Sequence, residues 1–388
     1  MTRQMANPSK RSLLKAVADH GPLSRSELAV LAGLSKAAIT GLSRELIQDG
    51  ALEESEAASP PRQGRPSILL RLNPAHGYFI GASIVEEPVT MVLTDFQGAV
   101  LGQRTAPWSP PWSYGDPQAI AGTIRDSIPH LLGGAGIPAE RLRGIGVALS
   151  GLVNHDQDRC LHSANLGWID LPVAAVVERA TGVPTFLEND ANAVATGERL
   201  YGLARDYRTF ATVTFGDSIG CAHYVDGVLY RGHGGGAGEI AHCTIEPGGL
   251  PCRCGKRGCL DTVAPRQAIL AQARALGLAA ATTAEVEALA AQGNADAIAI
   301  LHRAGGALGL AIAHVIQVND PEFVLIVDVE GAMGPLFRTV TQQAIEANVL
   351  PRLAASTTIR FHHATRALWA RGAASIAAHR FLTRAEED

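Results

Sequence analysis

The sequence predicts an α/β protein with a small helical head at its N-terminus. Helical segments separated by turn residues occupy positions 8 to 50, whereas strand and helix patterns alternate from residue 78 onward. One histidine and three cysteines also cluster between residues 242 and 259. A chain of 388 residues with 47% hydrophobic and 18% charged residues is large enough for two or three domains around buried cores.

The head begins with a helix over residues 8 to 21, where apolar residues recur at helical spacing. Ser24, followed by Glu27 three positions later, forms a capping box that starts a second, short helix. Gly33 ends that helix, and Ser35 caps a third helix that runs roughly to residue 49. Two helices joined by a brief glycine-containing turn are typical of a helix-turn-helix.

The second helix of such a motif enters the major groove of DNA. Its exposed residues are the candidate DNA contacts: Ser35, Lys36, Ala37, Thr40 and Arg44. Its other face is expected to pack inward: Ala38, Ile39, Leu42, Leu46 and Ile47.

A β-wing is expected after the third helix, with strands at residues 52–54 and 67–72. Arg62 and Arg65 lie in its Pro- and Gly-rich tip and suit a narrow minor groove. Residues 1–72 carry ten basic and seven acidic residues, whereas the whole chain has a net charge of −4. We therefore predict a winged helix-turn-helix DNA-binding domain over residues 1–73. The alternative is a small helical protein-interaction module.

The body opens with strands at residues 78–84 and 89–95, and Gly98 turns the chain into a third strand. A helix near residues 117–132 precedes a strand at 144–149. This β-β-β-α-β order indicates an α/β core. The N-terminus lacks a signal-peptide pattern, and no stretch is expected to reach the length of a membrane-spanning helix.

The central cysteine run predicts a metal site. One imidazole and three thiols provide the four ligands of a closed, structural zinc site: His242, Cys252, Cys254 and Cys259. The alternative is three unrelated buried thiols. The remaining cysteines are expected to be small buried core residues: Cys160, Cys221 and Cys243.

Three motifs together make the sequence similar to the ROK family of repressors, open reading frames and sugar kinases. They are Asn189-Asp190-Ala191-Asn192, Gly238-Glu239-Ile240-Ala241-His242 and the run from Cys252 to Cys259. The resemblance covers residues 78 to 375 and implies a two-lobed, actin-like (ribonuclease H-like) body. Lobe 1 would comprise residues 74–190 with a C-terminal helix at about 366–388, and lobe 2 residues 191–365 with the zinc loop. The helix-turn-helix points to the repressor branch, which includes xylose-type and N-acetylglucosamine-type repressors.

The resemblance also implies a set of sugar-binding residues: Asn165, Asn189, Asp190, Glu239, His242 and Asp261. Asp190 stands where the kinases keep their general base, and here it is read as vestigial. Asp261 replaces the glutamate that is usual in the family. The alternative role for Asn189 and Asp190 is to cap a helix.

The loops that bind ATP phosphates in the family's kinases are altered. The first loop reads Ser83-Ile84-Val85-Glu86-Glu87, the second Gly216-Asp217-Ser218-Ile219-Gly220, and the adenosine-side glycine pair is replaced around Val327-Asp328-Val329. Added carboxylates repel phosphates, and lost glycines hinder close backbone approach. We therefore expect no catalysis; an active ATP-dependent sugar kinase with a regulatory head is the alternative, and an interaction scaffold a third.

The sequence as a whole indicates a cytoplasmic bacterial regulator of transcription that responds to a sugar. Its expected partners are operator DNA, a monosaccharide and a second copy of the chain in a homodimer or tetramer, with no membrane. Bound to DNA it would be found at the nucleoid. Glucose, xylose and N-acetylated hexosamines, the sugars usual in the family, are all compatible with the motifs.

Overall fold

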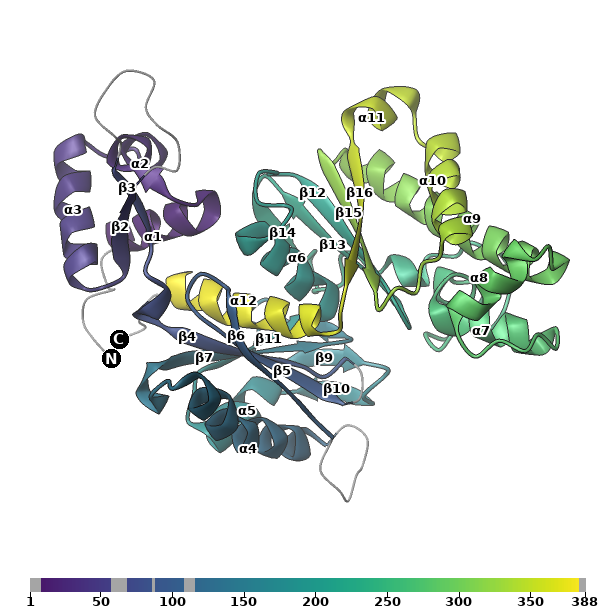
Figure 1. The fold of residues 1–388 in the computed structure, drawn as a ribbon, viewed down its shortest axis with the longest axis horizontal. Helices are drawn as coiled ribbons and strands as arrows, with labels where there is room; N and C mark the ends of the chain where they lie inside the picture. The colour runs from purple at the N-terminus through teal and green to yellow at the C-terminus, as the bar shows by residue number, and fades with distance from the viewer. Residues whose placement is uncertain (1–7, 57–67, 86–87, 108–115, 384–388) are drawn as a thin grey trace.

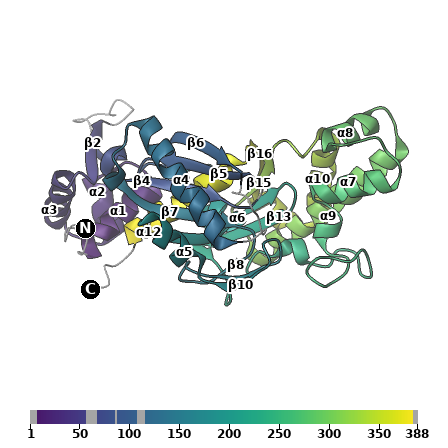
Figure 2. The same cartoon turned by 90° about the horizontal axis from the view of Figure 1, so that it is seen from below.

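The computed structural model describes residues 8–56, 68–85, 88–107 and 116–383. Figure 1 shows a small head beside two larger lobes, each built on a five-stranded sheet with helices against it. The C-terminal helix α12 (Ala367–Thr383) runs along the first sheet and reaches the head. The view in Figure 2 places the head and the helical end of the second lobe at opposite ends of the molecule.

The head contains three helices and a three-stranded sheet of order β1-β3-β2. The elements are α1 (Pro8–His20), β1 (Leu23–Ser24), α2 (Arg25–Ala32), α3 (Lys36–Gln48), β2 (Leu52–Glu56) and β3 (Ile68–Leu72). This is the element order of a winged helix-turn-helix. The predicted capping box at Ser24 and Glu27 is present, and Gly33 ends α2 at a φ of 63°, a conformation that favours glycine.

The inward face of α3 differs in part from the expected one. Ile39 and Leu46 are buried as predicted, whereas the other three expected core residues are only partly buried. Ser43 is fully buried, which the apolar pattern did not predict. Its hydroxyl accepts a hydrogen bond from Arg25 and donates one to the carbonyl of Thr40, so the burial is satisfied.

The first lobe is a sheet of order β11-β7-β4-β5-β6. Its strands are β4 (Tyr78–Ser83), β5 (Val89–Thr94), β6 (Val100–Ala106), β7 (Leu142–Leu149) and β11 (Thr185–Asn189). Helices α4 (Pro117–Ala135) and α5 (Val173–Thr181) cover one face and α12 the other. A Cβ added at Gly81 or Gly146 would lie 1.8 Å from a backbone oxygen of α12, so these glycines allow the helix to approach closely.

A small sheet extends the first lobe towards the cleft. It has the order β10-β9-β8, with β8 (Leu152–Val153), β9 (Cys160–Ser163) and β10 (Trp168–Leu171). Short 3-10 turns at Pro74–His76 and Ala139–Arg141 precede β4 and β7.

The second lobe has the sheet order β14-β13-β12-β15-β16. Its strands are β12 (Phe210–Phe215), β13 (Ile219–Val225), β14 (Val228–Tyr230), β15 (Phe323–Val329) and β16 (Thr358–Ala364). Its outer helices are α7 (Arg266–Ala275), α8 (Thr283–Ala291), α9 (Ala295–Asn319), α10 (Pro335–Asn348) and α11 (Pro351–Ser356). Helix α6 (Asp190–Tyr201) packs between this sheet and α12.

Helix α9 corrects one expectation and refines another. It is long and apolar enough to cross a membrane by length and composition, so the expectation that no segment qualifies was wrong; yet 61% of its most apolar window is buried inside the protein. Gly305 and Gly309 give close packing, since an added Cβ would lie 3.0 and 2.5 Å from atoms of α10. Gly306 faces open space and does not share that role.

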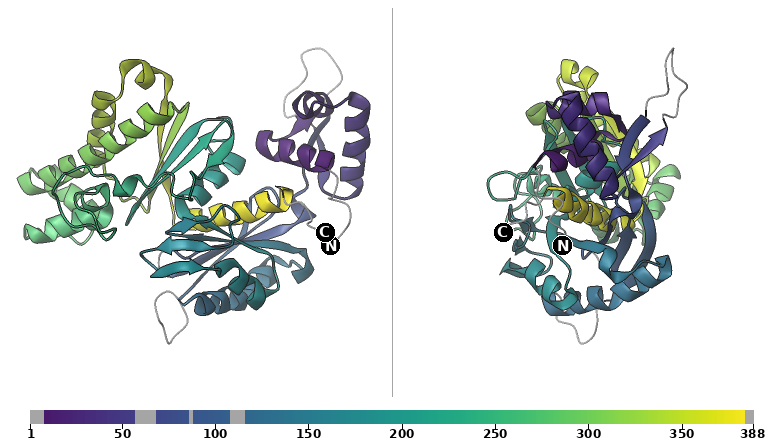
Figure 3. Two further views of the ribbon diagram at one scale, coloured as in Figure 1. Left: turned by 180° about the vertical axis from the view of Figure 1, so that it is seen from behind. Right: turned by 90° about the vertical axis from the view of Figure 1, so that its left-hand side faces the viewer.

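The head shares its apolar core with the body. Leu13 and Leu14 of α1 belong to one buried cluster with Phe79, Val194 and Ile376, which lie on β4, α6 and α12. The side views in Figure 3 place the head over the C-terminal half of α12. Because this contact is apolar and continuous, the head is packed on the body and is not merely tethered to it.

Candidate functional site

The cleft between the two lobes contains two adjoining cavities of about 280 and 320 Å³. Both are lined by residues of the first lobe, of α6 and of the second lobe. The shared residues are Ser150, Asn165, Asp190, Ser218, Gly220 and Arg253. The 280 Å³ cavity is here called the sugar cavity because most of the predicted sugar residues line it. It also contacts the loop that carries the candidate metal ligands, residues 242–259, here called the metal loop.

Five of the six predicted sugar residues line the sugar cavity: Asn165, Asn189, Asp190, Glu239 and His242. Asp261 lines neither cavity, which differs from the expectation. Its carboxylate, only 9% exposed, instead pairs with Arg253 at 3.2 Å and accepts a hydrogen bond from Ser218. Asp261 therefore does not line the sugar cavity itself but contacts Arg253 and Ser218, which do.

Asn189 and Asp190 lie where β11 turns into α6. The Asn189 amide oxygen accepts hydrogen bonds from the backbone N–H of Ala191 and Asn192, and its amide nitrogen donates to the Gly151 carbonyl. Asn189 is therefore the N-cap of α6, the role that was the alternative to sugar binding. Asp190 begins the helix and lines both cavities, where the helix N-terminus favours an acidic group.

Glu239 and His242 lie on a single 3-10 turn, Ile240–His242, and its N-cap. Burial raises the pKa of the Glu239 carboxyl, although the imidazole of His242 opposes this effect. The His242 Nε2 atom lies 4.0 Å from the Glu239 carboxylate, and its Nδ1 atom lies 3.6 Å from the Cys252 Sγ. The Nε2 atom is thus on the side of Glu239 and the sugar cavity, and the Nδ1 atom is on the side of the cysteine thiols.

The candidate metal ligands converge as the spacing predicts. One ligand atom from each of His242, Cys252, Cys254 and Cys259 lies within 4.8 Å of the others. Burial and the neighbouring thiols raise the pKa of the Cys259 thiol to about 12, while a backbone hydrogen bond from Lys256 lowers that of Cys254. A divalent cation would supply the positive charge that lets such crowded thiols ionise together, so the donor set fits a metal ion.

A glycine in the metal loop allows the chain to bring the candidate ligands together. Gly258 has a φ of 70°, and a Cβ there would lie 1.7 Å from the Glu246 carbonyl oxygen. Of the three remaining cysteines, Cys160 and Cys221 are buried as expected. Cys243 is exposed, so the expectation was wrong for that residue.

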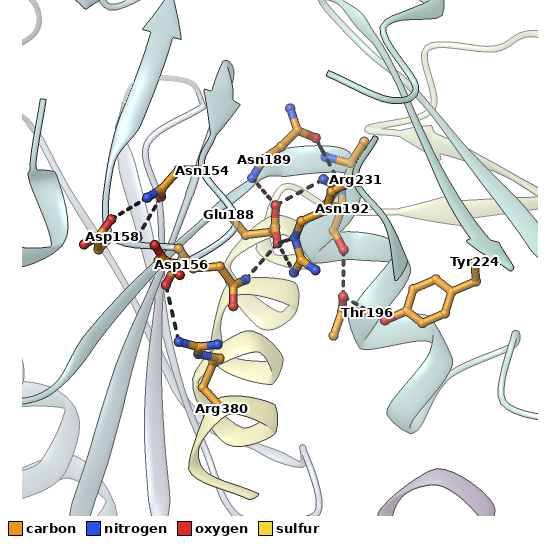
Figure 4. Close-up of polar contacts among 12 residues, drawn as sticks. Asn154, Asp156, Asp158, Glu188, Asn189, Asn192, Thr196, Tyr224, Arg231 and Arg380 are labelled. Carbon is orange, nitrogen blue, oxygen red and sulfur yellow. Dashed lines mark hydrogen bonds and ion pairs between the residues drawn. The ribbon is translucent and has the colours of Figure 1, made fainter. Parts of the chain in front are cut away.

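A buried polar network centred on Glu188 lies next to Asn189 (Figure 4). The sequence did not predict it. The Glu188 side chain is 2% exposed and accepts hydrogen bonds from Arg231 at 2.6 Å, Gln157 at 2.8 Å and Asn192 at 3.1 Å. Glu188 belongs to β11 of the first lobe, whereas Arg231 follows β14 of the second. The network therefore connects the two lobes beside the sugar cavity. A carboxylate within an apolar strand was the only sequence signal for it.

Two of the carboxylates in the altered phosphate loops are paired with arginines in the structure, which the sequence did not indicate. Asp217 forms an ion pair with Arg266 at 2.5 Å, so its charge does not stand unopposed as expected. Asp328 is fully buried, pairs with Arg338 and accepts a hydrogen bond from the Met333 N–H. The two glutamates of the first loop, residues 86 and 87, lie outside the described residues.

The five candidate DNA contacts of α3 are all exposed: Ser35, Lys36, Ala37, Thr40 and Arg44. Ser35 also caps the helix by accepting a hydrogen bond from the Ala38 N–H. Arg62 and Arg65 lie outside the described residues.

Two lobes on five-stranded sheets, with a polar cleft between them, define a protein of the two-lobed, actin-like class. Residues 90–380 match the model of the ROK family, and the chain belongs to that family.

The chain is similar to both branches of the family. A xylose repressor from Bacillus subtilis is 26% identical over 320 residues, which cover 82% of this chain and 81% of that protein. A glucokinase from Halalkalibacterium halodurans is 29% identical over 293 residues, covering 71% of this chain and 88% of the kinase. A crystal structure of a ROK family transcriptional regulator, a homologue of the Escherichia coli Mlc protein, covers 98% of this chain at a TM-score of 0.79 and 26% identity. At 98% coverage, the similarity to this transcriptional regulator includes the head.

Proposed function

We propose that this protein is a sugar-responsive transcriptional repressor whose body binds a monosaccharide and whose head binds operator DNA. One observation carries the proposal: helix α6 begins at the sugar cavity and reaches the head. Asp190 is its first residue, and Arg199 on its third turn donates a hydrogen bond to the Asp19 carbonyl of α1. Nine residues of helix span about 13 Å, which makes α6 a short, direct connection.

The proposed sugar contacts are Asp190, Glu239, His242 and Asn165, with Asn189 acting mainly through its cap. Carboxylates and amides suit a monosaccharide because its hydroxyls need both donors and acceptors. A zinc ion held by His242 and the three cysteines would fix the loop that carries Glu239. Zinc has no chemical step to perform in such a four-ligand site.

In the proposed mechanism the sugar changes the angle between the lobes, and α6 carries that change to α1. A ligand shifts this equilibrium only if it binds the two arrangements with different affinities. The cross-lobe bond between Glu188 and Arg231 is one interaction whose geometry would differ between them. Release of DNA by the sugar is the direction we propose.

We propose three functional units: residues 1–73 for DNA, 74–190 with 366–388 as lobe 1, and 191–365 as lobe 2. Two heads in a homodimer would place their α3 helices in successive major grooves, with Arg62 and Arg65 at the minor groove. The protein would act in the cytoplasm and at the nucleoid.

We further propose that kinase activity is lost. Phosphoryl transfer requires a bound nucleotide and metal ions placed by phosphate-binding loops. The glycines of the first loop and the central glycine of the second are replaced, and the Asp217–Arg266 pair occupies the second loop. Asp190 alone supplies no phosphate donor.

A thermal-shift screen tests the proposal. Purified protein is heated with each member of a neutral sugar panel, with and without ATP and Mg²⁺, and then assayed for sugar phosphate. One sugar should raise the melting temperature in a concentration-dependent way, because it binds the folded state alone. ATP should add nothing, and no phosphorylated product should form. Turnover above a no-protein control would support the kinase alternative.

A further inference from the structure

Arg253 belongs to the metal loop but reaches into the cleft. It lies between Cys252 and Cys254, two of the candidate metal ligands. Its Nη1 atom is 2.5 Å from the Asn165 amide oxygen, and its Nη2 atom is 3.2 Å from both the Ser218 hydroxyl and the Asp261 carboxylate. One guanidinium therefore satisfies three acceptors of the cleft.

These acceptors come from both lobes. Asn165 lies in the turn between β9 and β10 of the first lobe, whereas Ser218 and Asp261 belong to the second. Arg253 lines both cavities and so lies at the boundary between them. It forms a second polar connection across the cleft, and it is partly exposed whereas Glu188 is buried.

The guanidinium engages the same group that a sugar needs. The Asn165 amide nitrogen donates one of its two N–H groups to the Ser150 hydroxyl, and the amide oxygen is the acceptor that this side chain can offer to a ligand. That oxygen now accepts from Arg253. A sugar hydroxyl that donates to this oxygen competes with Arg253 for its two acceptor positions.

The Arg253 side chain is exposed enough to move away from the cleft. It is 40% exposed, and its long aliphatic stem can swing into water while the cysteines hold its backbone. Asp261 is only 9% exposed, but its carboxylate also accepts a hydrogen bond from Ser218, so it keeps a partner when the arginine moves.

We propose that Arg253 is a latch, meaning that its guanidinium bridges the lobes across the cleft in the sugar-free protein and competes with the sugar for the Asn165 amide oxygen. The proposal rests on the proposed function, since it concerns the same cavity. Arg253 would then set the affinity for the sugar by competing with it.

The test uses Arg253→Ala, Arg253→Lys and the control Arg257→Ala in the full-length protein. Arg257 is an exposed arginine of the same loop, so its removal changes the charge equally without touching the cleft. Calorimetric titration with the sugar found by the thermal-shift screen should give roughly tenfold tighter binding for Arg253→Ala, equivalent to one lost competing contact. Arg253→Lys should lie between, and Arg257→Ala should match the wild type. Metal content must be equal in all four proteins.

Equal or weaker binding by Arg253→Ala, at equal metal content, would overturn the latch. A second measurement does not depend on any sugar: a double-mutant cycle in denaturant between Arg253→Ala and Asn165→Ala. The two losses of stability should be non-additive, because the residues share a bond. Additive losses would contradict the latch on their own. Failure of every sugar to bind the wild type would count against the proposed function, and the cycle would still decide the cross-lobe contact.

Discussion

The guanidinium of Arg199, buried in α6, donates a 2.9 Å hydrogen bond to the backbone carbonyl of Asp19 at the end of α1. Arg205 adds a second hydrogen bond, to the Ala18 carbonyl at 3.3 Å. Two cationic side chains of the body thus hold the C-terminus of the first head helix, where the helix dipole favours positive charge. The orientation of the head relative to α6 depends on these contacts.

Replacing Arg199 with methionine should weaken the coupling between sugar binding in the body and DNA binding by the head. The substitution keeps most of the apolar stem but removes the donor, so we expect a loss of about 2 kcal/mol in the free energy of unfolding. Sugar affinity should stay within about twofold, while the sugar-induced change in DNA affinity should shrink severalfold. Calorimetry and fluorescence anisotropy measure the two quantities.

The matched control is Arg208→Met. Arg208 is exposed and its hydrogen bond to the Asp226 carbonyl stays within the second lobe. It should retain the full response to sugar. An Arg199 variant that folds and responds like this control would remove α6 from the mechanism.

Local chemistry made much of the fold predictable. The capping box at Ser24 and the spacing of the cysteine run depend on residues close together in the chain, so a single sequence reveals them. Arg253, Glu188 and Arg199 were missed because their partners lie 88, 43 and 180 residues away. Such pairings are set by the packing of the lobes, and no local pattern encodes them. Asp217 was misjudged for the same reason, since its partner is Arg266.

Removing one candidate metal ligand should weaken both metal and sugar binding. In Cys259→Ser a hydroxyl replaces a thiolate, so we expect loss of bound zinc and a lower melting temperature. Sugar affinity should fall at least tenfold because Glu239 and His242 lie on the same loop. Metal analysis and calorimetry are the measurements. Cys243→Ser is the control: Cys243 is exposed and lies outside the cluster, and equal losses in both variants would refute a specific metal site.

Neutralising Glu188 should be far more costly than neutralising an exposed carboxylate. Glu188→Gln leaves the Arg231 guanidinium next to a neutral amide in a largely buried site, and we expect a loss of about 3 kcal/mol. Asp170→Asn breaks the exposed pair with Arg159, in which Asp170 is 63% exposed, and should cost below about 1 kcal/mol. Denaturant unfolding of both variants provides the comparison. Similar costs would mean that the network contributes little to joining the lobes.

The stability of the protein should fall in mild acid through His379 of α12. The pKa of this imidazole is lowered from 6.5 to about 4, chiefly by burial. Lys15 of α1 and Arg231 and Arg380 of the body add to this effect, whereas Asp19 of α1 opposes it. Between these values the unfolded chain binds a proton that the folded protein does not, so stability is complete above pH 6.5 and is lost as the pH falls to 4. A shift of this size corresponds to about 3 kcal/mol.

Unfolding measured from pH 8 to pH 4 checks this expectation against His379→Gln. The variant should show a shallower decline, because glutamine does not titrate. Identical pH profiles for the two proteins would assign the acid sensitivity to other groups. Burial also lowers the pKa of His76 and His223, which remain in both proteins and do not affect the difference.

The central claim is that a sugar bound at Asp190 and Glu239 controls DNA binding by the head. The most direct test is a gel-shift titration of the protein–operator complex with the sugar identified by thermal shift, using wild type, Asp190→Ala and Glu239→Ala. All three proteins should bind the operator equally without sugar, and only the wild-type complex should dissociate as sugar is added. Dissociation of the Asp190 and Glu239 complexes at the wild-type sugar concentration would contradict the account.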